Sequence, residues 1–476
     1  MPDEPKPNSD VKKPLEFTEE TPVVTTHEAA GLKYTVTTGR MPLRDDQGEI
    51  VSQMFYMAYT VDSGKGGAKR PLMFSFNGGP GSPSVWLHLG ALGPKRAPML
   101  EDGNLPPGPY DVIDNPHNWL QFTDLVFIDP IGTGFSRSRS PEEAEKNWSI
   151  QGDIESVGEF IRLYLTRNNR WNSPLYLVGE SYGTTRAAGL AGYCIDRGIA
   201  FNGIVLVSSI LNFQTARFNR GNDLPYVLFL PTYCATALYH GKASGVTLDQ
   251  CRRFAEGPYA SALAKGDKLS EKERKSVIAE LSKLTGLSKT YIDFCDLRIY
   301  IQGFCKELLR DERRTVGRLD SRIKGIDDWG KGHTEEPEHD PSMSVLMPPY
   351  VSAFCGYVRS QLGYESDLEY LVFKGIKKPW DWGSAGDGHP DTSEALRQCL
   401  AKYPYMKLFV ASGLYDLATP FFATEYTLAH MGLDPEVRDN FTVQEYEAGH
   451  MMYINEPCLT RLCVDVKTFV SQSQSN

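Results

Sequence analysis

Residues 179–183, GESYG, decide how the surrounding chain folds. They follow an apolar run at residues 175–178 (LYLV) and precede an Ala- and Gly-rich segment at residues 184–195. The apolar run predicts a buried strand, and the small residues predict a closely packed helix. Glycines on either side of a serine permit a tight strand-to-helix turn that exposes the Ser181 hydroxyl. A solvated serine in an ordinary turn is the alternative, but the flanking strand and helix favour a nucleophile.

An acid and a histidine follow Ser181 in the order that this kind of turn requires. Asp416 comes after a strand-like run at residues 406–412, and His450 after another at residues 441–446. Open α/β sheets keep their chemistry at the carboxyl ends of strands, so we expect the three side chains to meet there. His450 would take the Ser181 proton, and Asp416 would fix the tautomer of His450. A structural histidine is the alternative for His450 alone.

Four blocks of sequence resemble the serine carboxypeptidases, a family of the α/β-hydrolase superfamily. The blocks are residues 76–82 (FNGGPGS), residues 115–136 with their NPHNW and GTGFS runs, residues 179–182 (GESY) and residues 447–451 (EAGHM). The resemblance implies an α/β-hydrolase core, which is a mostly parallel central sheet flanked by helices. It also implies a serine-type carboxypeptidase that hydrolyses C-terminal peptide bonds through a Ser-Asp-His triad and an acyl-enzyme.

The same resemblance assigns roles to residues beside the predicted triad. It implies that the backbone N–H groups of Gly79 and Tyr182 form an oxyanion hole. Loss of one such donor lowers the rate of an enzyme by about 10²–10³. It further implies a binding site for the free carboxylate of a peptide C-terminus, made by Asn77, Gly78, Glu180 and Met451.

Glu180 fits that carboxylate role only when it is protonated, because two bare carboxylates repel each other. Burial raises the pKa of a carboxyl group and keeps it able to donate a hydrogen bond. The alternative is a structural acid paired with a nearby base such as Arg186.

The chain departs from the family pattern at three places. Ala91 stands where the family often has a second Glu before Leu-Gly-Pro, so the pair of carboxyl groups lacks one member. Residues 82–84 (SPS) replace a Cys-Ser-Ser run, so a disulfide anchored there is absent. After His450, Met452 and Tyr453 stand where a proline is often found.

Composition agrees with a globular enzyme. Hydrophobic residues make up 41% of the 476 residues, enough for a sizeable core. The net charge of −10 argues against nucleic acid or an anionic membrane surface as a partner. No run approaches the roughly 20 apolar residues that span a bilayer. No cofactor or metal is expected, and peptide or protein C-termini are the expected partners. The oligomeric state stays open.

The nine cysteines are odd in number and form no C-x-x-C motif. Cys295 with Cys305, and Cys458 with Cys463, are candidates for local pairing. Buried free thiols are the alternative for most of the nine.

Four regions are expected along the chain. Residues 1–27 are predicted to be a disordered tail rather than a signal peptide. Residues 28–213 form the first part of the core, residues 214–345 a helical cap insertion, and residues 346–476 the second part. A secretory signal removed beforehand would place the protein in the periplasm or outside the cell, and otherwise it is expected in the cytoplasm. His333 and His339 lie in a connector rather than a metal site.

Two alternatives to a carboxypeptidase remain. An esterase or acyltransferase can use the same scaffold with a different acyl pocket. A catalytically silent binding protein can keep the fold, although an intact triad argues against it.

Overall fold

A ten-stranded sheet runs through the part of the chain that the computed structural model describes, residues 17–29, 31–61, 70–327, 336–386 and 388–474. The strand order is β1-β2-β3-β7-β4-β9-β10-β13-β14, and β8 pairs with β3. The strands are β1 (Val23–Ala29), β2 (Leu32–Arg44), β3 (Ile50–Val61), β4 (Leu72–Phe76), β7 (Asp124–Ile128), β8 (Arg137–Ser138), β9 (Leu175–Ser181), β10 (Gly203–Ser209), β13 (Lys407–Gly413) and β14 (Phe441–Tyr446).

The central strands are parallel, as the sequence predicts. Strands β7, β4, β9, β10, β13 and β14 pair in parallel, whereas β1, β2 and β3 form an antiparallel edge that joins them at β7. Parallel strands end at the same edge, so the loops after β4, β9, β13 and β14 are brought together. The expected mostly parallel central sheet is confirmed.

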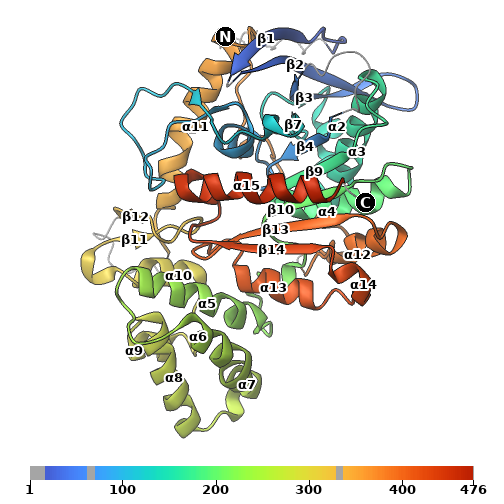
Figure 1. Cartoon of the computed structure of the whole chain (residues 1–476). Helices are drawn as coiled ribbons and strands as arrows, with labels where there is room; N and C mark the ends of the chain where they lie inside the picture. The colour runs from blue at the N-terminus through green and yellow to red at the C-terminus, as the bar shows by residue number, and fades with distance from the viewer. Residues whose placement is uncertain (1–16, 30, 62–69, 328–335, 387, 475–476) are drawn as a thin grey trace, which may run out of the picture.

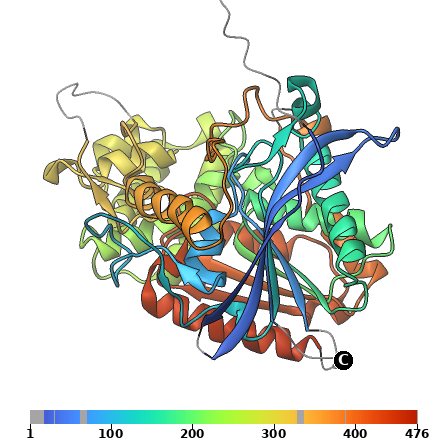
Figure 2. The same cartoon turned by 90° about the horizontal axis from the view of Figure 1, so that it is seen from above.

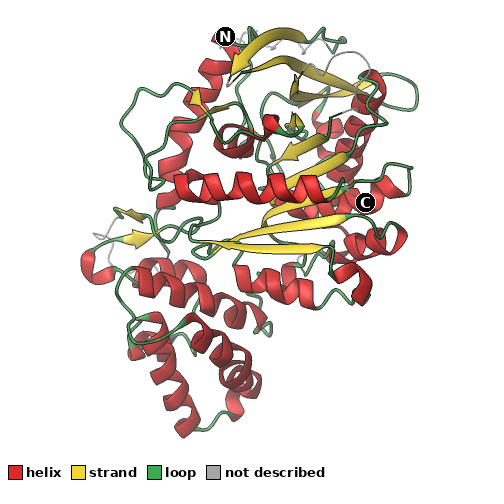
Figure 3. Ribbon diagram, in the orientation of Figure 1, coloured by secondary structure: helices red, strands yellow, loops and turns green. Residues whose placement is uncertain are grey.

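Alternate residues of the central strands enter two different hydrophobic cores. In β9, Leu175 and Leu177 pack in one core, and Tyr176 and Val178 in the other. Because side chains alternate along a strand, these cores lie on opposite faces of the sheet. Figures 1 and 3 show the sheet between the two helical layers.

Helices cover both faces. One core takes residues from α3 (Ile150–Arg167), α4 (Tyr182–Ile195) and α12 (Ser393–Lys402), and the other from α11 (Pro341–Ser360) and α15 (Glu456–Gln472). The N-terminus of α3 is fixed by Ser149, whose Oγ accepts the Gly152 N–H at 2.9 Å. Thr392 is the N-cap residue of α12 and makes no side-chain cap hydrogen bond.

The remaining helices are mostly outside the two layers. They are α1 (Val85–Leu87), α2 (Pro141–Glu145), α5 (Leu224–Tyr239), α6 (Leu248–Phe254), α7 (Ala260–Lys265), α8 (Glu271–Thr285), α9 (Lys289–Phe294), α10 (Ile301–Glu307), α13 (Phe421–Ala429) and α14 (Pro435–Arg438). Short strand pairs are β5 (Lys95–Arg96) with β6 (Ile113–Asp114), and β11 (Thr315–Val316) with β12 (Lys324–Gly325).

Helices α5 to α10 lie between β10 and β11 along the chain and contribute most of the residues of a third hydrophobic core. They gather at one side of the sheet, away from β1–β3 (Figures 1 and 2). Phe421 and Phe422 of α13 also pack in this core, so it is continuous with the main body. The expected end of the insertion at residue 345 falls inside α11. Residues of α11 pack in a core of the sheet.

The N-terminal segment predicted to be a disordered tail, residues 1–27, contains part of a strand. Residues 1–16 of the expected tail lie outside the described residues, but residues 23–29 form β1 and pair with β2 along its length. Its β-branched residues at positions 23–26 suit a strand, and backbone pairing with β2 orders the segment. His333 also lies outside the described residues.

Two other sequence expectations concern cysteines and membranes. Cys305, Cys458 and Cys463 are free thiols, so neither local disulfide forms. None of the described helices has both the length and the apolar character needed to cross a bilayer.

Candidate active site

Ser181 stands at the end of β9 and directly before α4, in a strained backbone conformation. Its φ is 59° and its ψ is −130°, a region that non-glycine residues rarely adopt. The neighbouring glycines are required by contact: a Cβ on Gly179 would overlap the Gly183 carbonyl, and one on Gly183 would lie 2.9 Å from the Phe76 carbonyl oxygen. The predicted strand-to-helix turn is present, with its serine partly exposed.

Asp416 and His450 meet at the carboxyl ends of β13 and β14. His450 Nδ1 lies 2.7 Å from Asp416 Oδ2. The other oxygen of Asp416 accepts the N–H groups of Ala418 at 2.7 Å and Thr419 at 3.0 Å. The Thr419 hydroxyl donates to Asp416 Oδ2 at 2.7 Å. The carboxylate is therefore held in place from several sides, and it orients the imidazole.

Two opposing effects set the pKa of His450. Burial disfavours its charged form, whereas the negative charge and hydrogen bond of Asp416 favour it. The effect of Asp416 prevails, with a smaller contribution from Glu180, and the pKa of His450 is raised above its ordinary value. A histidine of this kind is a stronger base than a free imidazole.

Seven of the nine predicted site residues line one cavity of about 290 Å³. They are Asn77, Gly78, Gly79, Glu180, Ser181, His450 and Met451. The other two lie behind its wall: Asp416 is fully buried behind His450, and the ring of Tyr182 packs against Trp380 and Trp382 at centroid distances of 5.3 and 6.0 Å. Only the backbone of Tyr182 is therefore available to the site.

The glycine turn after β4 packs directly against the serine turn. A Cβ on Gly78 would overlap the Tyr182 nitrogen and lie 2.7 Å from the Glu180 carbonyl oxygen. Gly79 has a φ of 106°, which favours glycine. The Tyr182 N–H belongs to the first turn of α4, where N–H groups have no partner within the helix. The turn after β4 and the start of α4 are therefore in direct contact next to Ser181.

Glu180 is a buried acid with two neutral hydrogen-bond donors. Asn77 Nδ2 donates to Glu180 Oε1 at 3.0 Å, and the Tyr453 hydroxyl donates to Oε2 at 2.6 Å. Burial raises the pKa of Glu180 to about 7, although the positive charge of His450 and these two hydrogen bonds oppose the rise. The alternative of a pair with Arg186 is wrong, because Arg186 Nε binds Asp153 at 2.8 Å.

Residues that the sequence did not single out complete the cavity. They are Ser82, Trp86, Arg318, Leu319, Met343 and Phe373. Arg318 and Leu319 come from the loop between β11 and β12. That loop is joined to the histidine loop, since the His450 N–H donates to the Leu319 carbonyl at 2.6 Å. It is also joined to the aspartate loop, since the Leu417 N–H donates to the Arg318 carbonyl at 3.0 Å.

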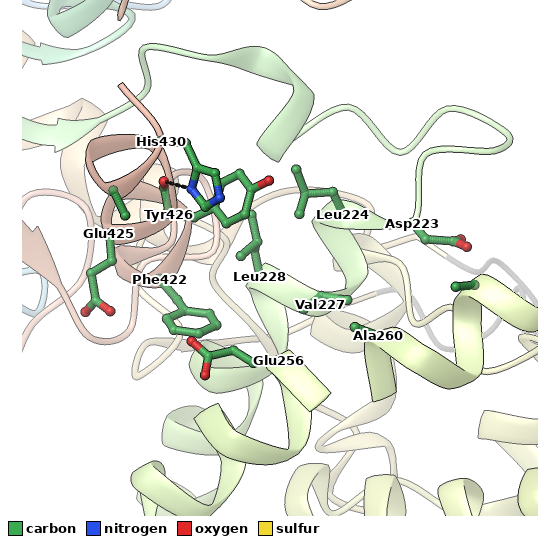
Figure 4. Close-up of a pocket in the computed structure, with 12 residues that line it drawn as sticks. Asp223, Leu224, Val227, Leu228, Glu256, Ala260, Phe422, Glu425, Tyr426 and His430 are labelled. Carbon is green, nitrogen blue, oxygen red and sulfur yellow. Dashed lines mark hydrogen bonds between the residues drawn. The ribbon is translucent and has the colours of Figure 1, made fainter. Parts of the chain in front are cut away.

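A larger cavity of about 590 Å³ lies elsewhere, between α5 and α13 (Figure 4). Val227 and Leu228 of α5 line it together with Phe422 of α13. The described residues that line it include no Ser, Thr or Cys, and none of the predicted site residues. Its size therefore does not make it the better candidate for hydrolytic chemistry.

The fold and the arrangement around Ser181 define the class of this protein as an α/β-hydrolase. Residues 35–216 match the family model described as serine carboxypeptidase. Serine carboxypeptidase-like 9 of Arabidopsis thaliana is 26% identical over 186 residues, which are 37% of this chain and 39% of that protein. The pheromone-processing carboxypeptidase KEX1 of Saccharomyces cerevisiae is 33% identical over 162 residues, 30% of this chain and 20% of that protein.

A solved structure agrees in fold. The crystal structure of the prohormone-processing carboxypeptidase KEX1 of Saccharomyces cerevisiae has a TM-score of 0.53 and 16% identity, and the match covers 92% of this chain and 91% of that one. The sequence match spans about two fifths of the first curated relative. The resemblance of this chain to the serine carboxypeptidase family, indicated by its motifs, is confirmed.

Proposed function

We propose that the protein is a serine-type carboxypeptidase that hydrolyses the last peptide bond of peptides or proteins. Ser181 Oγ attacks the carbonyl carbon of that bond while His450 takes the serine proton. The C–N bond then breaks, and His450 gives the proton to the leaving amine. A water molecule, activated by His450, hydrolyses the acyl-enzyme and restores Ser181. Asp416 stabilises the imidazolium form of His450 in each step.

The oxyanion of both tetrahedral intermediates would be bound by the N–H groups of Gly79 and Tyr182. Gly78 allows this arrangement because it leaves the backbone of the serine turn unobstructed. Donors fixed before the reaction stabilise developing charge without reorganisation, which is why we assign this role to backbone groups.

The single observation that favours a carboxypeptidase over other hydrolases is the buried Glu180 carboxyl beside Ser181. A pKa of about 7 keeps a substantial protonated fraction near neutral pH. A protonated carboxyl donates a hydrogen bond to a substrate carboxylate instead of repelling it. Asn77 adds an amide, and Gly78 and Met451 complete the proposed subsite along the same cavity.

A peptide ladder tests this proposal. The protein is incubated with a peptide that has a free C-terminus and with the same peptide as its C-terminal amide, and the products are followed by mass spectrometry. We expect stepwise loss of C-terminal residues from the free acid, and a kcat/KM for the amide that is lower by about ten- to a hundredfold. Equal cleavage of the two peptides, or internal cleavage, contradicts the proposal.

An esterase or acyltransferase is the second candidate, favoured by the apolar side chains of Trp86, Met343 and Phe373 along the cavity. Labelling by a fluorophosphonate at Ser181 without any shortening of peptides would support it. Absence of labelling in the folded protein would favour the silent binding protein.

A further inference from the structure

The loop that carries His450 also brings a buried phenol to Glu180. Tyr453 lies in the 3₁₀ turn Met452–Ile454 and is 1% exposed. Its ring packs so closely on Gly90 that a Cβ there would overlap the ring. Gly90 belongs to the helical turn His88–Leu92, which also contains Ala91. Tyr453 therefore fills space next to the position where the sequence lacks a second acid.

Tyr453 and Asn77 together hold both oxygens of the Glu180 carboxyl. The orientation of Asn77 is itself fixed, because its Oδ1 accepts the Leu87 N–H at 3.0 Å and leaves Nδ2 for Glu180 Oε1. The Asn77 carbonyl accepts a hydrogen bond of 2.6 Å from Arg186. Each oxygen of Glu180 accepts one hydrogen bond, so the acid proton of the protonated carboxyl is the group that can donate into the cavity.

Among the hydrogen-bonded side chains of Asn77, Glu180 and Tyr453, only Glu180 titrates in the working pH range. His450 and Asp416 are the charged groups that affect it, with opposite signs. Burial and the nearby Glu180 charge raise the pKa of Tyr453 well above 10, so its hydroxyl stays protonated at every working pH. Tyr350 is also a buried phenol with a raised pKa. A second carboxyl would add another titrating proton, and a phenol does not.

We propose that Tyr453 is a positioning residue that, with Asn77, holds the Glu180 carboxyl so that its proton meets the C-terminal carboxylate of a peptide substrate. The proposal rests on the proposed carboxypeptidase function. It makes the carboxylate subsite depend on the histidine loop, because Tyr453 follows His450 by three residues. Binding of the correct substrate end and placement of the base are thus fixed by one segment of chain.

Tyr453→Phe tests the role of the hydroxyl alone, since the ring is kept. We expect KM for a free-acid peptide to rise about tenfold, which is the cost of one hydrogen bond near a charged group, with little change in kcat. Hydrolysis of the matching amide and of a neutral ester without a carboxylate should stay within about twofold of wild type. Equal losses on all three substrates would show a merely structural role and overturn the proposal.

Tyr176→Phe is the matched control. Tyr176 is another buried tyrosine of the same chain, and its hydroxyl lies 2.7 Å from the Ser473 hydroxyl, outside the cavity. The control loses a comparable hydrogen bond, and we expect it to keep the wild-type preference for a free acid. A similar loss of preference in Tyr176→Phe would overturn the assignment to Tyr453.

Infrared difference spectroscopy decides the proposal independently of the substrate. The carboxyl stretch of Glu180, identified by its absence in Glu180→Gln, is titrated in wild type and in Tyr453→Phe. Loss of a donor to the ionised carboxylate should shift the Glu180 titration to higher pH. Superimposed titrations would reject the role of Tyr453. If the two titrations differ but free-acid and amidated peptides are cleaved equally, the proposed carboxypeptidase function is wrong. The hydrogen bond between Tyr453 and Glu180 would still be supported.

Discussion

His450 Nδ1 and Asp416 Oδ2 lie 2.7 Å apart although 34 positions separate the residues along the chain. One follows β13 and the other follows β14, and these strands are parallel neighbours in the sheet. Parallel pairing therefore brings the two loops to one edge of the sheet, where Ser181 is the last residue of β9. The geometry needs all three strand ends, so the proposed triad is a property of the sheet rather than of a local motif.

We expect Ser181→Ala and His450→Ala each to lower kcat by about 10⁴–10⁶, because triad members act as a unit. Asp416→Asn should cost about 10⁴, since an amide N–H facing Nδ1 favours the wrong tautomer of His450. Rates with a free-acid peptide, measured together with the melting temperature, check this. Near wild-type turnover by folded Ser181→Ala would exclude Ser181 as the nucleophile.

Ser181→Gly should also be inactive, but it should be more stable than Ser181→Ala. The φ of 59° strains any residue with a Cβ, a cost of order 1–3 kcal/mol, and glycine relieves it while losing roughly 0.5–1 kcal/mol of chain entropy. We expect a net gain of about 1 kcal/mol in the free energy of unfolding. Urea titrations of the two variants give the comparison, and equal stabilities would mean that the turn stores no strain.

Gly78→Ala should abolish most activity, because the new methyl group must displace the serine turn. The clash is with the backbone of Tyr182 and Glu180, which has no freedom to move without moving Ser181. Gly356→Ala in α11 is the matched control: its Cβ would meet nothing within 4 Å. We expect the control to keep full activity and to gain roughly 0.5–1 kcal/mol in stability. An active Gly78→Ala enzyme would exclude a preformed oxyanion hole at this turn.

The dependence of kcat/KM on pH should be bell-shaped with its maximum near neutrality. His450 must be neutral to act as a base, so activity falls as the pH drops through its raised pKa. Glu180 must be protonated to bind a carboxylate, so affinity falls as the pH rises through about 7. Because the two groups interact, the acid and alkaline sides of the curve give macroscopic pKa values that belong to the pair. A neutral ester should keep the acid limb and lose the alkaline limb. If activity on the ester also falls at alkaline pH, the titration of Glu180 does not cause that fall.

Arg318 should favour substrates with an acidic side chain next to the scissile bond. It is the one Lys or Arg among the described residues that line the cavity of Ser181. We expect peptides with Asp to be cleaved about fivefold faster than those with Asn, and Arg318→Gln to remove the difference. Arg253→Gln, an exposed residue on α6, changes the net charge equally and serves as the control. The preference should weaken as salt is raised, and a preference retained in Arg318→Gln would exclude Arg318 as its source.

The sequence predicted those structural elements that depend on residues close together in the chain. Apolar runs bounded by turns correctly predicted the central strands, and the glycines at 179 and 183 correctly predicted the turn at Ser181. The predicted tail boundary is wrong because residues 23–29 pair with β2 as β1, and the β-branched run at residues 23–26 (VVTT) is typical of a strand. The partner of Arg186 also depends on packing: α3 presents Asp153 to it, while Glu180 faces the cavity.

Other parts of the cavity have no sequence pattern to predict them. Met343 and Phe373 reach it from α11 and from the loop after it, and their positions depend on how the second layer packs on the sheet. Tyr453 was visible only as a departure from the family pattern beside His450. Its contact with Glu180 joins positions 273 residues apart and required the structure.

The loop between β11 and β12 is bonded to the histidine and aspartate loops by side chains as well as by the carbonyl groups of Arg318 and Leu319. Asp320 Oδ2 accepts the Gly449 N–H at 3.1 Å, and Ser321 Oγ donates to the Tyr415 carbonyl at 3.0 Å. A carbonyl is the same chemical group in nearly every residue, so the contacts of Arg318 and Leu319 constrain only the path of the chain. The contacts of Asp320 and Ser321 also constrain which residues can stand at these two positions. Relatives that keep all of these contacts are therefore expected to keep an acceptor at position 320 and a donor at position 321, while positions 318 and 319 are free to vary. The family match, which ends at residue 216, stops before this loop is reached.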